Sequence, residues 1–219
     1  MNSRKDLACK VLAALKIRYP YSHPHLVAAD SWELLVATVL AAQCTDARVN
    51  TVTPGLFERW PDPASLAEAS LEDLEKVIRP TGFFHSKAKN LLGAARRVRD
   101  VFNGTVPRSI AELITLPGVA RKTANVVLSG AYGINEGIAV DTHVKRISYR
   151  LSLTDNTDPV SIERDLMQVF PREEWGDVNH RMVSFGRDVC CARKPRCGEC
   201  EMLSFCPQRD IPRATRTRE

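Results

Sequence analysis

The chain has 219 residues, 44% of them hydrophobic but only 6% aromatic, and its formal net charge is +5. This length suits one generous domain or two small ones, and the low aromatic content favours helices packed by Leu, Val and Ala. No segment has the run of about 18 apolar residues that a membrane span requires, and the first residues lack the apolar core of a secretory signal. We therefore expect a cytoplasmic protein that stays out of membranes, with a charge compatible with a polyanionic partner.

Apolar residues at helical spacing predict a series of short helices and no strands. Asp30 and Glu33 resemble a capping box that opens an apolar helix ending near Leu40, which should be buried centrally. Pro and Gly residues separate the elements. The other expected helices span residues 4–18, 46–59, 71–78, 86–102, 142–151, 160–169 and 175–189, with a helix, a tight turn and a second helix between residues 110 and 132.

Residues 116–124, with the sequence LPGVARKTA, end one helix and begin the next. Backbone N–H groups at a helix start lack intrahelical partners and lie at the positive end of the dipole, so they suit a phosphate, and Gly118 permits its close approach. The helix start and Arg121 both disfavour the ammonium form of Lys122. A neutral amine can attack C1′ of a nucleotide, displace the base and remain as a Schiff base that permits β-elimination. The alternative is a lysine that is simply a solvated charge.

Residues 138–146, IAVDTHVKR, place Asp141 between an apolar run and a new helix. Asp is a favoured N-cap residue, and that role is compatible with a catalytic one. A turn at residues 133–137 can return the carboxylate to the start of the preceding helix. There it can accept a proton from the amine and stabilise positive charge on the sugar as the base departs.

Five of the seven cysteines fall within residues 190–206, which argues for metal binding in a chain without export signals. Six, two and five residues separate four of them: Cys190, Cys197, Cys200 and Cys206. Structural zinc sites typically use two separate short pairs, so this spacing favours a [4Fe–4S] cluster over zinc. We expect Cys191 to be a spectator or a local packing residue, and Cys9 and Cys44 to be buried thiols.

Three cations lie between the first two cysteines of this set: Arg193, Lys194 and Arg196. A loop pinned at both ends loses little freedom on binding, so these side chains suit phosphate contact, with solvated surface charge as the alternative. Residues 209–219 contain four arginines and almost nothing apolar, which predicts a flexible basic tail.

The hairpin segment, the IAVDTHVKR segment and the C-x6-C-x2-C-x5-C loop resemble, in order and spacing, the endonuclease III family of helix-hairpin-helix DNA glycosylases, and the resemblance covers nearly the whole chain. It implies an all-α, two-lobed fold. Residues 25–135 would form a six-helix lobe with the hairpin, and residues 1–24 and 136–208 a discontinuous lobe carrying a [4Fe–4S] cluster that positions the basic loop. Residues 209–219 would be the tail.

The resemblance also implies an activity. The family's Schiff-base lysine corresponds to Lys122 and its aspartate to Asp141. The expected function is base excision repair, in which a monomeric glycosylase removes oxidised pyrimidines from double-stranded DNA, and an AP-lyase reaction then cleaves the strand at the abasic site. Monofunctional adenine glycosylases are a weaker alternative, because they lack a lysine at position 122 and usually carry a further C-terminal domain. A non-enzymatic DNA-binding protein is a third possibility.

Members of the family flip the damaged nucleotide out of the duplex and fill the gap with residues that correspond to Gln43 and Phe83. Aliphatic residues are familiar at the latter position, and both residues would equally suit a core. The remaining expected DNA contacts are Gly118, Ala120, Arg121, His143, Arg193, Lys194 and Arg196.

The hairpin departs from the family pattern at Ala120, where a second glycine is common. If this position required a positive φ, alanine would be strained by roughly 1 kcal/mol or more, and the phosphate contact would weaken. A helical conformation would leave it unstrained.

Overall fold

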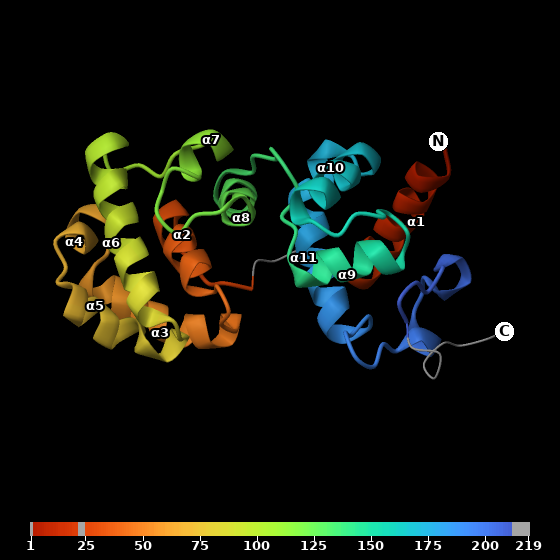
Figure 1. Cartoon of the computed structure of the whole chain (residues 1–219), viewed down its shortest axis with the longest axis horizontal. Helices are drawn as coiled ribbons and strands as arrows, with labels where there is room; N and C mark the ends of the chain where they lie inside the picture. Colours follow the sequence, from red (N-terminus) through yellow and green to blue (C-terminus); the bar gives the residue numbers. More distant parts are fainter. Residues whose placement is uncertain (1, 22–24, 212–219) are drawn as a thin grey trace. The chain divides into compact units, whose positions relative to one another are not determined.

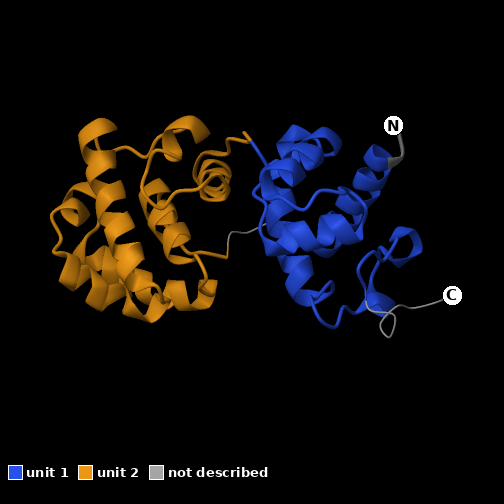
Figure 2. Cartoon of the chain, viewed as in Figure 1, with its two compact units in different colours: residues 1–23, 137–219 blue, residues 24–136 orange. Residues whose placement is uncertain are grey.

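The computed structural model describes residues 2–21 and 25–211, which are helical and contain no strand within those ranges (Figure 1). The predicted all-α class is confirmed. The chain divides into two compact units: unit 1 comprises residues 1–23 and 137–219, and unit 2 comprises residues 24–136 (Figure 2). In the described ranges, no helix combines the length and the apolar character needed to cross a membrane.

Unit 2 is organised around α2 (Ser31–Leu40), which is buried along nearly its whole length and packs on three neighbouring helices. The helices and the 3-10 turn of this unit that follow α2 are α3 (Asp46–Arg59), α4 (Pro63–Ala67), α5 (Leu71–Ile78), η1 (Arg79–Thr81), α6 (Phe84–Val101), α7 (Ile110–Leu113) and α8 (Arg121–Tyr132). Their core is mostly Leu, Val and Ala, as the composition predicts.

The start of α2 follows the expected capping pattern with one difference. The side chain of Asp30 accepts a hydrogen bond from the backbone N–H of Glu33, as an N-cap should. The carboxylate of Glu33 accepts from the N–H of Ala29, at 2.7 Å, and not from Asp30 itself. The reciprocal half of the capping box is therefore shifted by one residue.

Unit 1 is built from α1 (Asn2–Arg18), α9 (Thr142–Arg150), α10 (Pro159–Val169) and α11 (Trp175–Asp188), with the 3-10 turns η2 (Arg172–Glu174), η3 (Cys197–Glu199) and η4 (Leu203–Phe205). α11 packs on α1 and α9. At Gly186 of α11, an added Cβ would lie 2.5 Å from Nδ1 of His143 and 2.9 Å from Nη2 of Arg146. A side chain at this position would therefore displace the side chains of His143 and Arg146.

Residues 209–211, which the sequence assigned to a flexible basic tail, instead pack on unit 1. The guanidinium of Arg209 lies 4.1 Å from the ring centroid of Tyr149 and donates to Asp155 at 2.6 Å, and Ile211 is 4% exposed. A cation over an aromatic face and a buried isoleucine both favour a fixed position. The rest of the predicted tail, residues 212–219, lies outside the described residues.

Candidate functional site

The helix-hairpin-helix segment of unit 2 consists of α7, a tight turn and α8. Gly118 in the turn has a φ of +79°, and a Cβ there would lie 2.8 Å from Cβ of Asn90 on α6. Ala120, the N-cap of α8, has a φ of −89° and a ψ of 168°. It is extended, neither left-handed nor helical, so alanine carries no strain at this position.

The start of α8 has the features of an anion site. Ala120 has no polar side chain, and no side chain caps the helix. The first N–H groups of α8 therefore point outward at the positive end of the helix dipole. Arg121 and Lys122 occupy the first turn and are both exposed. A phosphate would meet backbone donors and cations here, and the amine of Lys122 is accessible to a ligand.

Asp141 of unit 1 is a half-buried N-cap of α9. Its Oδ1 accepts hydrogen bonds from the backbone N–H groups of His143 and Val144, both at 2.8 Å. Its Oδ2 has no hydrogen-bond partner among the described residues. The buried side-chain amide of Asn179, on α11, donates to the carbonyl oxygen of Ala139 at 2.6 Å. This bond holds the apolar residues that precede Asp141 against α11. One carboxylate oxygen thus fixes the backbone while the other is open for acid–base chemistry.

His143 is half-buried beside Gly186, and its Nδ1 lies 3.2 Å from Nη2 of Arg146. Burial lowers the pKa of His143, because the imidazolium loses solvation, and nearby Asp141 only partly opposes this. The imidazole is therefore neutral at physiological pH. As a DNA-contact residue it would act as a hydrogen-bonding group and not as a cation.

Gln43 and Phe83 lie on the surface of unit 2. Gln43 follows α2 and Phe83 is the residue before α6; both are exposed, Phe83 by 64%. The alternative that they belong to the core is therefore wrong. Their φ angles are 53° and 49°, in the left-handed region that costs a residue with a side chain about 1–2 kcal/mol. Such conformations persist only where the surroundings impose them, and they are often found at functional sites.

The four predicted cysteine ligands line one hollow in unit 1, which is partly open to solvent; Arg150, Val189 and Pro195 are among its other lining residues. Burial raises the pKa of the Cys200 thiol to about 11, and it raises the pKa values of Cys197 and Cys206 as well. In the described ranges, no group of three or more His, Cys, Asp or Glu side chains is arranged to hold a metal ion. Four cysteine thiols around one hollow match the ligand set of an iron–sulfur cluster.

Two arginines of α9 hold the first cysteine of this hollow. The buried Arg150 donates to the carbonyl oxygens of Cys191 and Ala192 at 2.8 and 2.9 Å, and its Nη1 lies 3.5 Å from Sγ of Cys190. Arg146 donates to the carbonyl oxygen of Cys190 at 3.0 Å. Neither residue was predicted from the sequence. Their spacing of four residues on the helix that Asp141 opens was the one available signal.

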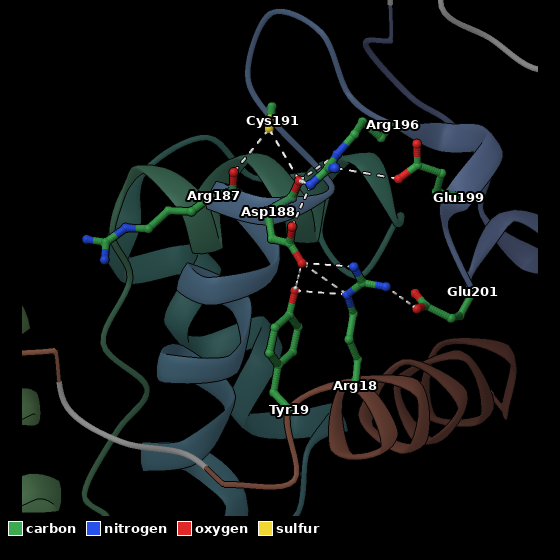
Figure 3. Close-up of polar contacts among 8 residues, drawn as sticks. All are labelled: Arg18, Tyr19, Arg187, Asp188, Cys191, Arg196, Glu199 and Glu201. Carbon is green, nitrogen blue, oxygen red and sulfur yellow. Dashed lines mark hydrogen bonds and ion pairs between the residues drawn. The ribbon is translucent and has the colours of Figure 1, made fainter.

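The basic loop is only partly available for contact with a ligand. Arg193 and Lys194 are exposed, but Arg196 pairs with Asp188 and with Glu199 (Figure 3). Since its charge is partly compensated within the protein, Arg196 is less suited to a phosphate than the other two cations.

Asp188 is the centre of the network that Figure 3 shows. Its Oδ2 accepts from Arg18 at 2.9 Å and from the hydroxyl of Tyr19 at 3.0 Å, and these bonds lower the pKa of Asp188. Arg18 also pairs with Glu201. The network therefore joins the end of α1, the end of α11 and the cysteine loop.

The three remaining cysteines, Cys191, Cys44 and Cys9, differ in their burial and contacts. Sγ of Cys191 donates to the carbonyl oxygen of Arg187 at 3.3 Å, and Cys191 does not line the hollow, in keeping with a spectator. Cys44 is half-buried. Cys9 is exposed, so the expectation of a buried thiol was wrong there: its position on α1 faces away from the core that Ala8 and Val11 enter.

Comparison with known proteins agrees with this architecture. A model of the HhH-GPD superfamily of base excision DNA repair proteins matches residues 36–172. The endonuclease III of Synechocystis is 52% identical over 207 residues, which cover 94% of each chain. A solved non-covalent endonuclease III–DNA complex has a TM-score of 0.89 and 43% identity, covering 95% of this chain and 97% of that one. A trapped endonuclease III–DNA covalent intermediate gives the same values.

A helix-hairpin-helix segment, an all-helical fold and a cysteine-lined hollow define the class as a helix-hairpin-helix repair protein. The chain belongs to the HhH-GPD superfamily and, within it, to the endonuclease III family. The resemblance stated from the sequence is confirmed.

Proposed function

We propose that this protein is a bifunctional DNA glycosylase of base excision repair, which removes oxidised pyrimidines from duplex DNA and then cleaves the strand as an AP lyase. The observation that carries the proposal is an exposed lysine, Lys122, in the first turn of the hairpin's second helix. The chain belongs to a family in which a covalent intermediate between protein and DNA has been trapped. Relatives are bacterial, and bacterial DNA lies in the cytoplasm, so we place the activity there.

Nζ of Lys122 attacks C1′ of the damaged nucleotide, and the glycosidic bond breaks so that its electron pair leaves with the base. Oδ2 of Asp141 accepts the proton that the amine loses and stabilises positive charge on the sugar. Opening of the sugar ring gives an imine between Lys122 and C1′. Loss of a proton from C2′ then expels the 3′ phosphate by β-elimination, and water releases the lysine.

DNA is held through its backbone at two places. A phosphate binds at the start of α8, where Gly118 permits its approach and the N–H groups after Ala120, together with Arg121, receive it. Arg193 and Lys194, with a smaller contribution from Arg196, contact a second part of the strand, and His143 adds a neutral hydrogen-bonding group. Gln43 and Phe83 fill the gap that the flipped nucleotide leaves.

A [4Fe–4S] cluster occupies the hollow and is held by Cys190, Cys197, Cys200 and Cys206. The raised pKa values of the buried thiols mean that they ionise together only when cationic iron compensates their charge. The cluster supplies no chemical step. It fixes the ends of the loop that carries Arg193 and Lys194.

The test is reduction with borohydride in the presence of duplex DNA that contains an oxidised pyrimidine or an abasic site. Only an amine that forms an imine is trapped covalently. We expect trapping by the wild type and by Lys145→Ala, which removes an exposed lysine of α9, and no trapping by Lys122→Ala, which should still bind DNA. Undiminished trapping by Lys122→Ala would remove this lysine from its role. Base release without trapping would indicate a monofunctional glycosylase, and binding alone a non-enzymatic protein.

A further inference from the structure

Lys87, near the start of α6, is a buried lysine of unit 2 that takes no part in the proposed reaction. It is 4% exposed, and burial lowers its pKa. It forms no ion pair with a carboxylate among the residues that the structure describes. A methionine would fill similar space without placing a charge in the core, so packing alone does not account for an ammonium group here.

The ammonium group of Lys87 links two separate segments of backbone. Nζ donates to the carbonyl oxygen of Leu40 at 2.7 Å and to that of Thr81 at 2.9 Å. Leu40 ends α2, where the helix dipole favours a cation, and Thr81 ends the turn η1. An ammonium has three donors, so it can hold both segments at once, which no apolar side chain can do.

Each linked carbonyl lies just before an exposed residue with a left-handed backbone. Leu40 precedes Gln43 by three residues, and Thr81 precedes Phe83 by two. The carbonyl oxygen of Phe83 accepts from the backbone N–H of Lys87 itself at 3.1 Å and from Ser86 Oγ at 2.9 Å. The same residue therefore anchors the backbone on both sides of Phe83 as well as the segment before Gln43.

We propose that Lys87 is a positioning residue that fixes two loops relative to each other: residues 41–45, which carry Gln43, and residues 81–85, which carry Phe83. It thereby sets how efficiently the protein separates a base pair. This inference rests on the proposed function, in which these two side chains fill the gap in the duplex. Lys87 does not touch DNA. It acts through the two loops, so its removal should matter only where a base pair has to be opened.

The first test compares two substrates under single-turnover conditions. One is a duplex with a paired lesion, and the other carries the same lesion in an unpaired bubble, where no pair has to be broken. Misplacement by about 1 Å can cost about a hundredfold in rate, so we expect Lys87→Met to lose about tenfold or more on the paired duplex. On the bubble it should stay within about twofold of the wild type. Lys89→Met, an exposed lysine two residues further along α6, should match the wild type on both.

A double-mutant cycle tests whether Lys87 acts through the two loops. In a Gln43→Ala/Phe83→Ala background, Lys87→Met should change the duplex rate by less than about twofold, because the groups that it positions are gone. Hydrogen exchange of residues 41–45 and 81–85 should accelerate together in Lys87→Met and stay unchanged at residues 116–124. If Lys87→Met does not fold, Lys87→Gln, which keeps a polar donor but is too short to bridge both carbonyls, takes its place.

Equal losses on both substrates, additive effects in the cycle, or unchanged exchange in the two loops would each overturn the inference. Failure of the proposed function looks different, because wild-type protein would then neither release the base nor be trapped on either substrate.

Discussion

Nη1 of Arg150 lies 3.5 Å from Sγ of Cys190, and the same guanidinium donates to the carbonyl oxygens of the next two residues along the chain. Arg150 is only 3% exposed. This one buried side chain therefore fixes the start of the cysteine loop.

We predict that Arg150→Met weakens retention of the proposed [4Fe–4S] cluster. The loss removes the donor that the carbonyl oxygens of Cys191 and Ala192 share, at a cost of about 0.5–1.5 kcal/mol for each hydrogen bond, and frees the backbone next to Cys190. The measurement is the decay of the cluster's visible absorbance during incubation with an iron chelator. Arg164→Met, which alters an exposed arginine of α10, should decay like the wild type. Equal decay in all three proteins would contradict the prediction.

The identity of the metal ligands is tested by a pair of cysteine substitutions. Cys200→Ser should lose most of the iron, because it removes a thiol from the wall of the hollow. Cys191→Ser should keep about four irons per chain, since its Sγ bonds to the backbone of α11. Elemental analysis of the purified proteins measures both. One zinc per chain in the wild type, or loss of iron in Cys191→Ser, would refute the assignment.

Gly118→Ala should destabilise the hairpin. The substitution puts a side chain at a φ of +79° and a Cβ 2.8 Å from Cβ of Asn90, so we expect a loss of about 1–3 kcal/mol in the free energy of unfolding and weaker DNA binding. Denaturant unfolding and a DNA titration measure these effects. Gly55→Ala is the matched control, because beyond its chain neighbours and the backbone of its own helix no atom lies within 4 Å of an added Cβ, and it should gain about 0.5–1 kcal/mol from helix propensity. Two variants of equal stability would show that the hairpin tolerates the change.

His143 makes stability depend on pH. Burial lowers its pKa in the folded state, so near and below the unfolded value of about 6.5 the unfolded chain binds more protons than the folded one. The contribution of neutral, half-buried His143 to the free energy of unfolding is therefore present above this pH and is lost as the pH falls below it. The free energy of unfolding should drop more between about pH 7.5 and about pH 5.5 in the wild type than in His143→Gln. A reversed order would contradict the assignment.

Most helices were predictable because their limits are local. α3 and α5 begin and end as expected, since Thr45 and Ser70 cap them and Pro or Gly residues follow. The short helix α4 was missed, although Asp62 and Ser65 form a capping box around its start. α6 begins two residues earlier than predicted, because the left-handed backbone of Phe83 starts the helix, and only the tertiary structure imposes that conformation.

Residue types and their spacing were enough to predict the fold class, the family and the candidate chemistry of Lys122, Asp141 and the cysteine loop. Each of those features depends on residue types within a short segment, so it can be recognised without knowing the fold. The contacts of Lys87 and Arg150, in contrast, emerge only when the chain is folded. A charged residue on a helix usually faces water, and whether it is buried depends on which segments, distant in sequence, pack against it. That packing brought Lys87 to the carbonyls of α2 and η1, and Arg150 to the start of the cysteine loop.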